Sequence, residues 1–164
     1  MCLPRWMPTG PPSAKAGAAN GAERMPTMAR VFVDTNVFIY AVDSGEPEKR
    51  DIARASLDEL AAAGELVTST QVLQEFYNIA VRKIGLRSVV AERCVREFAR
   101  NDTIQMSVEI ILAGIGLHRS ASLSIWDAFV IQAAIVSDCE QLLSEDLQHG
   151  RQFDQTVILD PFRA

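Results

Sequence analysis

The chain alternates between short, wholly hydrophobic runs and longer segments in which hydrophobic residues recur every three or four positions. The short runs predict strands that are buried on both faces, and the longer segments predict amphipathic helices. Strands are expected at five places: 31–33, 66–68, 103–106, 141–143 and 156–159. Helices are expected between them: 35–42, 47–63, 70–84, 88–100, 107–119 and 124–137.

Strands that are separated by helices require crossover connections, which predict a mostly parallel sheet. We therefore expect an α/β protein with a three-layer α/β/α fold and a central sheet of four to five strands. In such sheets ligands bind beyond the carboxyl ends of the strands, where the strand order reverses. The residues that directly follow each strand are therefore the candidates for a functional site.

The first 27 residues differ in composition from the rest. They hold five of the seven prolines together with a run of Gly, Ala and Ser. Such a segment cannot bury enough apolar surface to fold, so we expect 1–27 to be a disordered extension. It also lacks the apolar core of a signal peptide. Met28 is a plausible true start, and 28–164 is expected to be one domain.

Composition excludes several classes of protein. The chain has 164 residues, of which 48% are hydrophobic and 23% are charged, and this composition suits one globular domain. No apolar run is long enough to span a bilayer. Its three cysteines lack metal-site spacing and predict reduced thiols in a cytoplasmic protein. A net charge of −5 argues against broad nucleic-acid coating, although it permits a local basic patch.

Two acidic residues lie at candidate positions in the first half of the chain. Asp34 directly follows the first expected strand, where its carboxylate can also cap the next helix. Glu75 lies in the helix 70–84 beside Val72 and Ile79, on the flank of the hydrophobic stripe. Each residue has an ordinary structural explanation as well as a functional one.

Asp127 is the most informative acidic residue. Its helical neighbours Val130 and Ile131 are hydrophobic, although Ser124 can cap the helix and make Asp127 the acidic half of a capping box. A carboxylate on an apolar face is costly unless it is paired or binds a cation. The nearest upstream basic residue is Arg119, so a metal ion is the better partner.

Asp146 follows the expected strand 141–143. An aspartate in a turn is the ordinary interpretation of this position. Glu145, directly before it, is the alternative candidate for the same functional role. The pattern favours Asp146.

Taken together, these acidic residues predict a metal site. No lysine or histidine follows a strand to neutralise them, and carboxylates that are held close together repel unless a cation intervenes. Carboxylate oxygens suit Mg²⁺ or Mn²⁺ better than Zn²⁺. Such an ion activates water and stabilises displacement at phosphorus, which indicates phosphodiester hydrolysis.

The motifs VDTNV, QEF, SIWDAFV and LLSEDLQHG occur in this order, and the resemblance that they carry covers about residues 29–164. In this order they resemble a PIN-domain ribonuclease, especially the VapC toxins of bacterial toxin–antitoxin systems. WDA followed by SEDLQHG is the most specific part of the resemblance. The resemblance implies an acidic quartet with two supporting residues: Asp34, Glu75, Asp127 and Asp146, with Asn36 and Ser144.

The resemblance also implies a mechanism and partners. Asp34 and Asp127 would bind the ion directly, whereas Glu75 and Asp146 would act through water, through a second ion or by orienting the attacking hydroxide. RNA cleavage would leave 5′-phosphate and 3′-hydroxyl ends. The resemblance further implies a growth-inhibiting toxin that forms a homodimer and is neutralised by a cognate antitoxin.

Basic residues concentrate between 82 and 100. They are Arg82, Lys83, Arg87, Arg93, Arg96 and Arg100. The spacing of the last three predicts one shared helix face. This segment is either a solvated surface or a rim that contacts RNA phosphates, and we prefer the RNA-binding interpretation.

Two other classes of function remain open. A haloacid-dehalogenase-like phosphatase also has an Asp after its first strand, but it needs a second acid where this chain has Asn36. It also needs a lysine late in the sequence, whereas the last lysine is Lys83. A non-catalytic RNA- or protein-binding module would tolerate loss of the acidic residues, whereas a metal-dependent ribonuclease would not.

Overall fold

The computed structural model describes residues 29–163, so the expected disordered extension lies outside the described residues. The strands are β1 (Val31–Val33), β2 (Leu66–Ser69), β3 (Asp102–Ile104), β4 (Gln141–Leu143), β5 (Gln152–Phe153) and β6 (Thr156–Leu159). The helices are α1 (Thr35–Val42), α2 (Pro47–Ala63), α3 (Thr70–Arg82), α4 (Ser88–Phe98), α5 (Val108–Ala121) and α6 (Ile125–Val136).

One sheet holds all of these strands in the order β3-β2-β1-β4-β6-β5. β1 lies between β2 and β4 and is parallel to both, so that Phe32 pairs with Val67 on one side and with Leu142 on the other. Every residue of β1 is buried, which explains why its sequence is wholly hydrophobic. The predicted α/β fold with a mostly parallel sheet is confirmed.

The sheet contains one strand more than the four to five that we expected. β5 has two residues and pairs antiparallel with β6 across a tight turn in which Asp154 has a φ of 50°. Gln152 is exposed and Phe153 is half-buried, so no hydrophobic run marks this strand. It forms because the chain turns back within a few residues to pair with β6, and the periodicity of hydrophobic residues does not report a strand this short.

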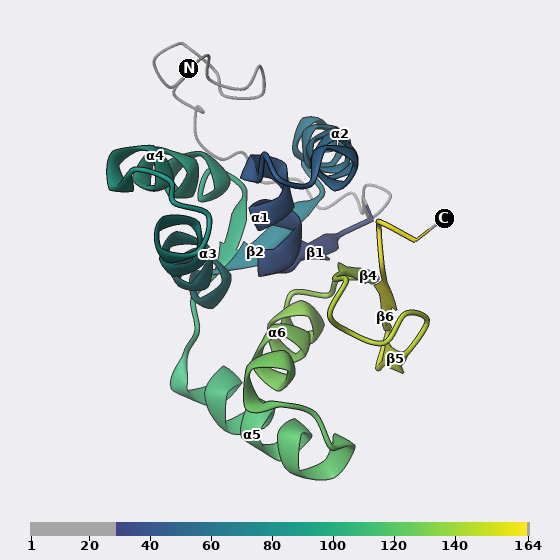
Figure 1. The fold of residues 1–164 in the computed structure, drawn as a ribbon. Coiled ribbons are helices and arrows are strands. Elements are labelled where there is room, and N and C mark those ends of the chain that lie inside the picture. The colour runs from purple at the N-terminus through teal and green to yellow at the C-terminus, as the bar shows by residue number, and fades with distance from the viewer. Residues whose placement is uncertain (1–28, 164) are drawn as a thin grey trace, which may run out of the picture.

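The helices form two groups that are separated by the sheet (Figure 1). α1 packs against α2 and α3, and α3 packs against α4, whereas α5 packs mainly against α6. The chain passes from β1 to β2 to β3 in one direction and then returns to place β4 on the other side of β1. The strand order therefore reverses between β1 and β4, where a ligand site is expected.

Helix boundaries follow local signals and differ from the prediction by one or two residues at several ends: α3 ends at Arg82 rather than at 84, and α5 spans Val108–Ala121 rather than 107–119. Pro47 begins α2, and Gly64 ends it in the left-handed conformation with a φ of 73°. α4 ends at Phe98 rather than at Arg100, because the chain continues in a turn with hydrogen bonds from residue i to i−3. Arg100 therefore lies two residues beyond the end of the helix.

The core is built around three phenylalanine rings. Phe98 lies with its ring centroid 4.3 Å from that of Phe38 and 5.1 Å from that of Phe76, which joins α1, α3 and α4. Cys94 and Cys139 are buried free thiols, as expected, and Cys2 lies outside the described residues.

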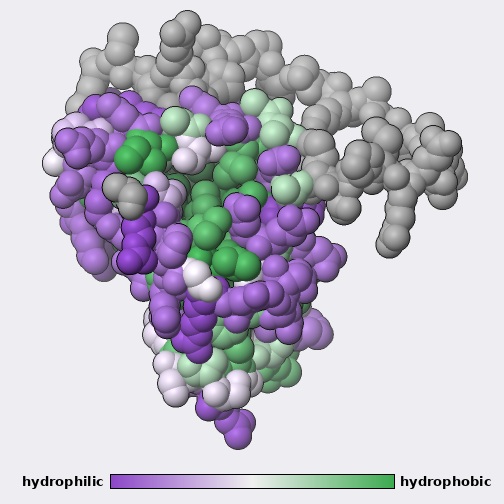
Figure 2. Space-filling model, turned by 90° about the vertical axis from the view of Figure 1, so that its right-hand side faces the viewer, coloured by the Kyte–Doolittle hydropathy of each residue, from purple (hydrophilic) through white to green (hydrophobic). Residues whose placement is uncertain are grey.

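The surface is uneven in polarity. Figure 2 shows a face on which a hollow strip of hydrophobic surface runs between hydrophilic margins. Among residues 29–163, no single helix is long and apolar enough to cross a membrane. α5 and α6 meet that length and composition only as a pair that is bent by 119°.

A glycine on α5 makes a prediction about how α5 and α6 pack. Gly114 is buried, and a methyl group on its Cα would lie 2.5 Å from Cδ1 of Phe129 on α6. We expect Gly114→Ala to lower the free energy of unfolding by about 1–3 kcal/mol because Phe129 must leave its position. Gly116→Ala is the matched control, since nothing lies within 4 Å of that methyl group. It should raise stability by up to about 1 kcal/mol through helix propensity. Equal effects in urea denaturation would contradict the close helix contact.

Candidate functional site

A cavity of about 300 Å³ opens at the carboxyl ends of β1 and β4, where the strand order reverses. Residues from α1, α3, α6 and the segment after β4 line it: Asp34, Thr35, Asn36, Ile39, Tyr40, Asp43, Gln71, Glu75, Ile79, Lys83, Ile84, Trp126, Asp127, Val130 and Asp146. The four acidic residues expected from the sequence are all among them. Four segments that are far apart in the chain therefore contribute carboxylates to one cavity.

Helical spacing explains how α3 lines one wall of this cavity. Gln71, Glu75 and Ile79 follow one another at intervals of four residues, so they share one face of the helix. Lys83, four residues further on, is the C-cap of α3 and reaches the same cavity. Along this face Gln71 and Glu75 are polar, Ile79 is apolar, and Lys83 is polar again.

Asp34 lies at the centre of the site. It caps α1, since one carboxylate oxygen accepts a hydrogen bond from the backbone N–H of Thr35 at 2.6 Å. The other oxygen accepts from Ser144 Oγ at 2.8 Å and from Asn36 Nδ2 at 3.4 Å. Burial raises the pKa of Asp34 to about 6. The hydrogen bonds from Ser144 and Thr35 oppose this rise, and the charges of Glu75 and Asp146 add to it.

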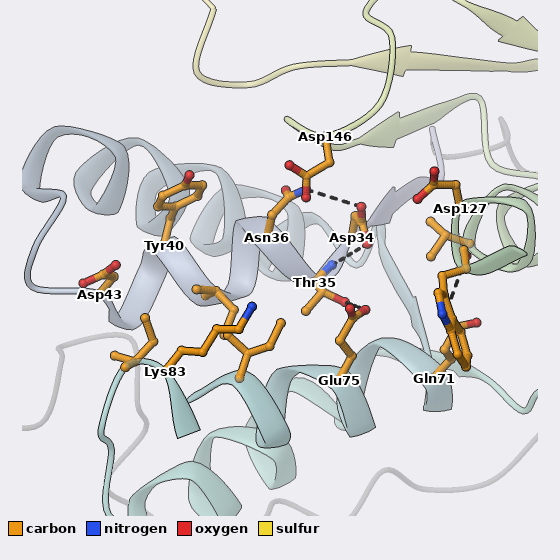
Figure 3. A pocket seen from close by; sticks show the side chains of 15 residues that line it. Asp34, Thr35, Asn36, Tyr40, Asp43, Gln71, Glu75, Lys83, Asp127 and Asp146 are labelled. Atoms are coloured by element: carbon orange, nitrogen blue, oxygen red, sulfur yellow. Dashed lines mark hydrogen bonds between the residues drawn. The ribbon is translucent and has the colours of Figure 1, made fainter. Parts of the chain in front are cut away.

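Asn36 and Ser144 connect Asp34 to Asp146. The amide nitrogen of Asn36 donates to Ser144 Oγ at 3.0 Å and to Asp146 Oδ2 at 3.1 Å. Figure 3 shows Asn36 beside Asp146, with its hydrogen bond to Asp34. The amide oxygen of Asn36 accepts the backbone N–H of Glu145 at 3.3 Å. These neutral groups hold the two aspartates in place without adding a positive charge.

Glu145, the alternative to Asp146, is engaged elsewhere. It forms an ion pair with Lys49, whose ammonium also donates to the Tyr40 hydroxyl at 3.2 Å. Burial is the largest single influence and favours a higher pKa for Glu145, but the hydrogen bonds from Lys49 and Tyr40 and the charge of Lys49 together outweigh it and lower the pKa below its ordinary value. Lys49 therefore pairs with Glu145, and Asp146 remains at the cavity.

Glu75 and Asp127 complete the acidic set in different ways. Glu75 accepts a hydrogen bond from Thr35 Oγ1 at 2.8 Å. The backbone N–H of Asp127 donates to Ser124 Oγ at 3.1 Å, so the expected N-cap is present. The side chain of Asp127 makes no hydrogen bond or ion pair with any other residue of 29–163, so the acidic half of a capping box is not formed.

As they stand, the carboxylates share a cavity but do not converge on one point. No group of three or more His, Cys, Asp or Glu side chains in the described part of the chain is close enough to hold a metal ion. The donor set nevertheless fits Mg²⁺ or Mn²⁺, because it consists of oxygen atoms around a buried aspartate whose charge lacks a cationic partner.

The six basic residues expected to contact RNA do not behave as one group. Lys83 is the one among them that lines the cavity, and within residues 29–163 it has no ion-pair partner. Arg96 pairs with Glu92 and Arg100 pairs with Glu97, both at 2.6 Å. The remaining three, Arg82, Arg87 and Arg93, are exposed and do not line the cavity.

Several lining residues were missed by the sequence analysis: Thr35, Tyr40, Asp43, Gln71 and Trp126. A signal for some of them exists, since Tyr40 and Asp43 follow Asn36 by four and seven residues and so share its face of α1. Gln71 precedes Glu75 by one helical turn in the same way. Trp126 lies beside Asp127 but could equally have been a core residue.

The raised pKa of Asp34 predicts how stability depends on pH. Because the folded pKa of about 6 exceeds the ordinary value of 3.8, the folded state binds this proton more tightly than the unfolded state. The stabilising contribution of the proton is therefore complete below about pH 4 and is lost as the pH rises through 6. In EDTA at pH 7, Asp34→Asn should raise the free energy of unfolding by about 1–2 kcal/mol, which is less than the full shift because Asn loses one acceptor.

Urea denaturation at pH 4 and pH 7 checks this prediction. Asp58→Asn is the matched control, because it removes an exposed carboxylate on α2. A gain for Asp34→Asn that persists unchanged at pH 4 would contradict burial of the charge as its cause.

Comparisons with known proteins bear on this geometry. A profile of the PIN domain family matches residues 31–153. VapC20 from Mycobacterium tuberculosis, described as a toxin that cleaves the sarcin-ricin loop, superposes with a TM-score of 0.55 and 20% sequence identity over 68% of this chain and 86% of its own. No curated protein matches the sequence.

Two toxin–antitoxin assemblies contain similar folds. A toxin–antitoxin complex from Klebsiella pneumoniae has a chain with a TM-score of 0.60 and 18% identity, over 83% of this chain and 100% of that one. VapBC2 from Rickettsia felis, bound to a DNA fragment from its promoter, also has a similar chain, with a TM-score of 0.58 and 18% identity. The match covers 78% of this chain and 96% of that one. At these identities the likeness concerns the fold, and the family match covers three quarters of the chain. The chain therefore belongs to the PIN domain family, and its structural neighbours are VapC toxins of VapBC systems.

Proposed function

We propose that this chain is a metal-dependent endoribonuclease that hydrolyses RNA phosphodiester bonds. The observation that carries the proposal is that Asp34, Glu75, Asp127 and Asp146, from four separate segments, line one cavity at the switch point of a PIN-domain sheet. Such an arrangement concentrates negative charge where a fold of this class binds its ligand. A bound divalent cation would balance this negative charge and supply the chemistry of hydrolysis.

The residues that would hold the ion are those with oxygen donors at the cavity. We propose Asp34 and Asp127 as direct ligands of Mg²⁺ or Mn²⁺, and Glu75 and Asp146 as residues that act through water or hold a second ion. When bound, the ion would polarise the phosphodiester and lower the pKa of a water molecule. Cleavage would leave 5′-phosphate and 3′-hydroxyl ends.

The neutral donors of the site have positioning roles in this proposal. Asn36 and Ser144 hold the carboxylates of Asp34 and Asp146 relative to each other, and Thr35 holds Glu75. A neutral donor restrains a carboxylate without cancelling the charge that attracts the ion. The proposed role of Asn36 also separates this site from that of a haloacid-dehalogenase-like phosphatase, which needs an acid there.

RNA is the proposed substrate because the similar VapC20 is described as cleaving the sarcin-ricin loop, which is RNA. Lys83 supports a phosphate contact, because its ammonium lies at an acidic cavity without an ion-pair partner in 29–163. By the same comparison we propose a growth-inhibiting toxin that acts in the cytoplasm as a homodimer and is neutralised by a cognate antitoxin.

Asp127 provides the first test of the proposal. Asp127→Asn should reduce Mg²⁺- or Mn²⁺-dependent cleavage of RNA by roughly 100-fold or more, because it removes a proposed direct ligand. The fold should persist, since the backbone N–H that Ser124 accepts is unchanged. Sequencing of new 5′-phosphate RNA ends after induced expression measures the activity, and circular dichroism monitors the fold.

Asp138→Asn is the matched control, because Asp138 is an exposed carboxylate that follows α6 and does not line the cavity. Its cleavage rate should equal that of the unaltered chain. Undiminished cleavage by purified Asp127→Asn protein would overturn the assignment and favour a non-catalytic binding module.

Lys83 provides a second test, which concerns RNA binding. Lys83→Gln should weaken RNA binding and reduce the slope of log K against log salt by about 0.7–0.9, the value for one phosphate contact. Arg93→Gln removes a positive charge that is exposed but does not line the cavity, so its slope should change less. A larger effect from Arg93→Gln would support the α4 surface as the RNA-binding rim instead.

A further inference from the structure

An exposed indole lies at the edge of the acidic cavity. The side chain of Trp126 is 63% exposed, and it lines the cavity directly beside Asp127. The other large hydrophobic side chains that are exposed within residues 29–163, such as Val89 and Leu112, lie away from this cavity. Of the two aromatic side chains that line the cavity, Trp126 and the half-buried Tyr40, the indole is the one that is largely exposed to water, and it lies beside the proposed point of catalysis.

Trp126 is held in place through its backbone and along part of its ring. The cap at Ser124 fixes the start of α6, and the Trp126 carbonyl accepts a hydrogen bond from Gln71 Nε2 at 3.4 Å. The indole meets Phe129 in a T-shaped contact, with ring centroids 6.0 Å apart and planes at 84°. These contacts orient the ring and leave most of its surface free.

Gln71 adds a second, independent feature at the same end of the cavity. Its side-chain oxygen Oε1 is buried and has no hydrogen-bond partner among the described residues. A buried acceptor without a donor is unfavourable, so turning of the amide toward the cavity, where a donor of the ligand can meet this oxygen, favours binding. A ribose hydroxyl and the amino group of a base are both such donors.

The cavity has distinct ends. Figure 3 shows Gln71 and Asp127 at one end and Asp43 and Lys83 at the other, with Asp34 between them. An aromatic surface with a hydrogen-bonding amide therefore lies at one end, and an ammonium lies at the other. A nucleic-acid strand presents both matching groups, since its bases stack on aromatic rings and its phosphates pair with lysine.

We propose that Trp126 is a base-stacking residue that binds the nucleotide beside the scissile phosphate, with the Gln71 amide hydrogen-bonding to its ribose or base. This inference rests on the proposed ribonuclease function and names how the same site grips a single strand. A nucleic acid is favoured over a protein partner because the same cavity holds the Gln71 amide, which suits a ribose or base, and the Lys83 ammonium, which suits a phosphate. A protein interface would place the indole in an apolar surround.

Binding and cleavage of short strands test the proposal in the full-length chain. The probes are ten-residue oligoadenylate, ten-residue oligouridylate and an abasic strand of the same length. Affinity is measured by fluorescence anisotropy in EDTA, and KM and kcat are measured with Mg²⁺. Trp126→Ala removes the ring, Trp126→Phe keeps a smaller ring, and Val136→Ala is the control on the same helix, since Val136 is exposed but does not line the cavity.

Stacking makes a specific pattern of results expected. Trp126→Ala should raise KM and the dissociation constant for oligoadenylate about tenfold, with a smaller loss for oligouridylate and none for the abasic strand. Trp126→Phe should recover part of the affinity, and Val136→Ala should match the unaltered chain. In a Trp6→Phe background, which leaves Trp126 as the sole tryptophan, oligoadenylate should quench the fluorescence and the abasic strand should not.

Failure of this inference and failure of the proposed function give different results. Cleavage by the unaltered chain together with an unchanged KM in Trp126→Ala overturns the stacking role alone. An equal loss for the abasic strand also overturns it. A changed oligomeric mass in sedimentation with unchanged RNA affinity assigns Trp126 to a protein interface instead. If the folded, unaltered chain neither binds nor cleaves any base-bearing strand with Mg²⁺ or Mn²⁺, the proposed function falls and takes this inference with it.

Discussion

The site depends on one electrostatic constraint, which is the burial of the Asp34 carboxylate at the end of the central strand. Burial, to which the nearby charges of Glu75 and Asp146 add, raises its pKa to about 6 against the opposing hydrogen bonds from Ser144 and Thr35. Only neutral donors from the described chain compensate: the backbone N–H of Thr35, the hydroxyl of Ser144 and the amide of Asn36. No lysine of the described chain pairs with the Asp34 carboxylate. Its negative charge is therefore left for a bound cation to balance.

The distribution of positive charge around the site follows from the same constraint. Lys49 pairs with Glu145 and contacts the rings of Tyr40 and Phe162, so its ammonium is committed beside the cavity and not to Asp146. Lys83 reaches the cavity from the end of α3. The acidic centre therefore keeps its charge, while a cation is available to a substrate at the cavity's end.

The topology gives the cavity its elongated form. Asp34 and Asp146 follow two adjacent parallel strands, whereas Gln71 and Glu75 lie on a helix that begins after the neighbouring strand β2. In this proposal the carboxylates in the middle of the cavity take part in cleavage, and the side chains at its two ends bind the RNA. Trp126 and Lys83 are side chains of different helices, so each end can change without altering the carboxylates.

Sequence alone determined the order of the helices and of five of the six strands, and the mostly parallel character of the sheet, because these depend on local periodicity. It also placed Asp34, Glu75 and Asp127 among the candidate site residues, since each follows a strand or lies beside hydrophobic residues on a helix. It did not determine β5, whose pairing with β6 has no hydrophobic run behind it, or the choice between Glu145 and Asp146, which Lys49 makes from 96 residues away. It also treated the basic segment as one surface, although Lys83 alone among its six residues lines the cavity. Tertiary structure decided these points because each is a contact between residues that only the folded chain brings together.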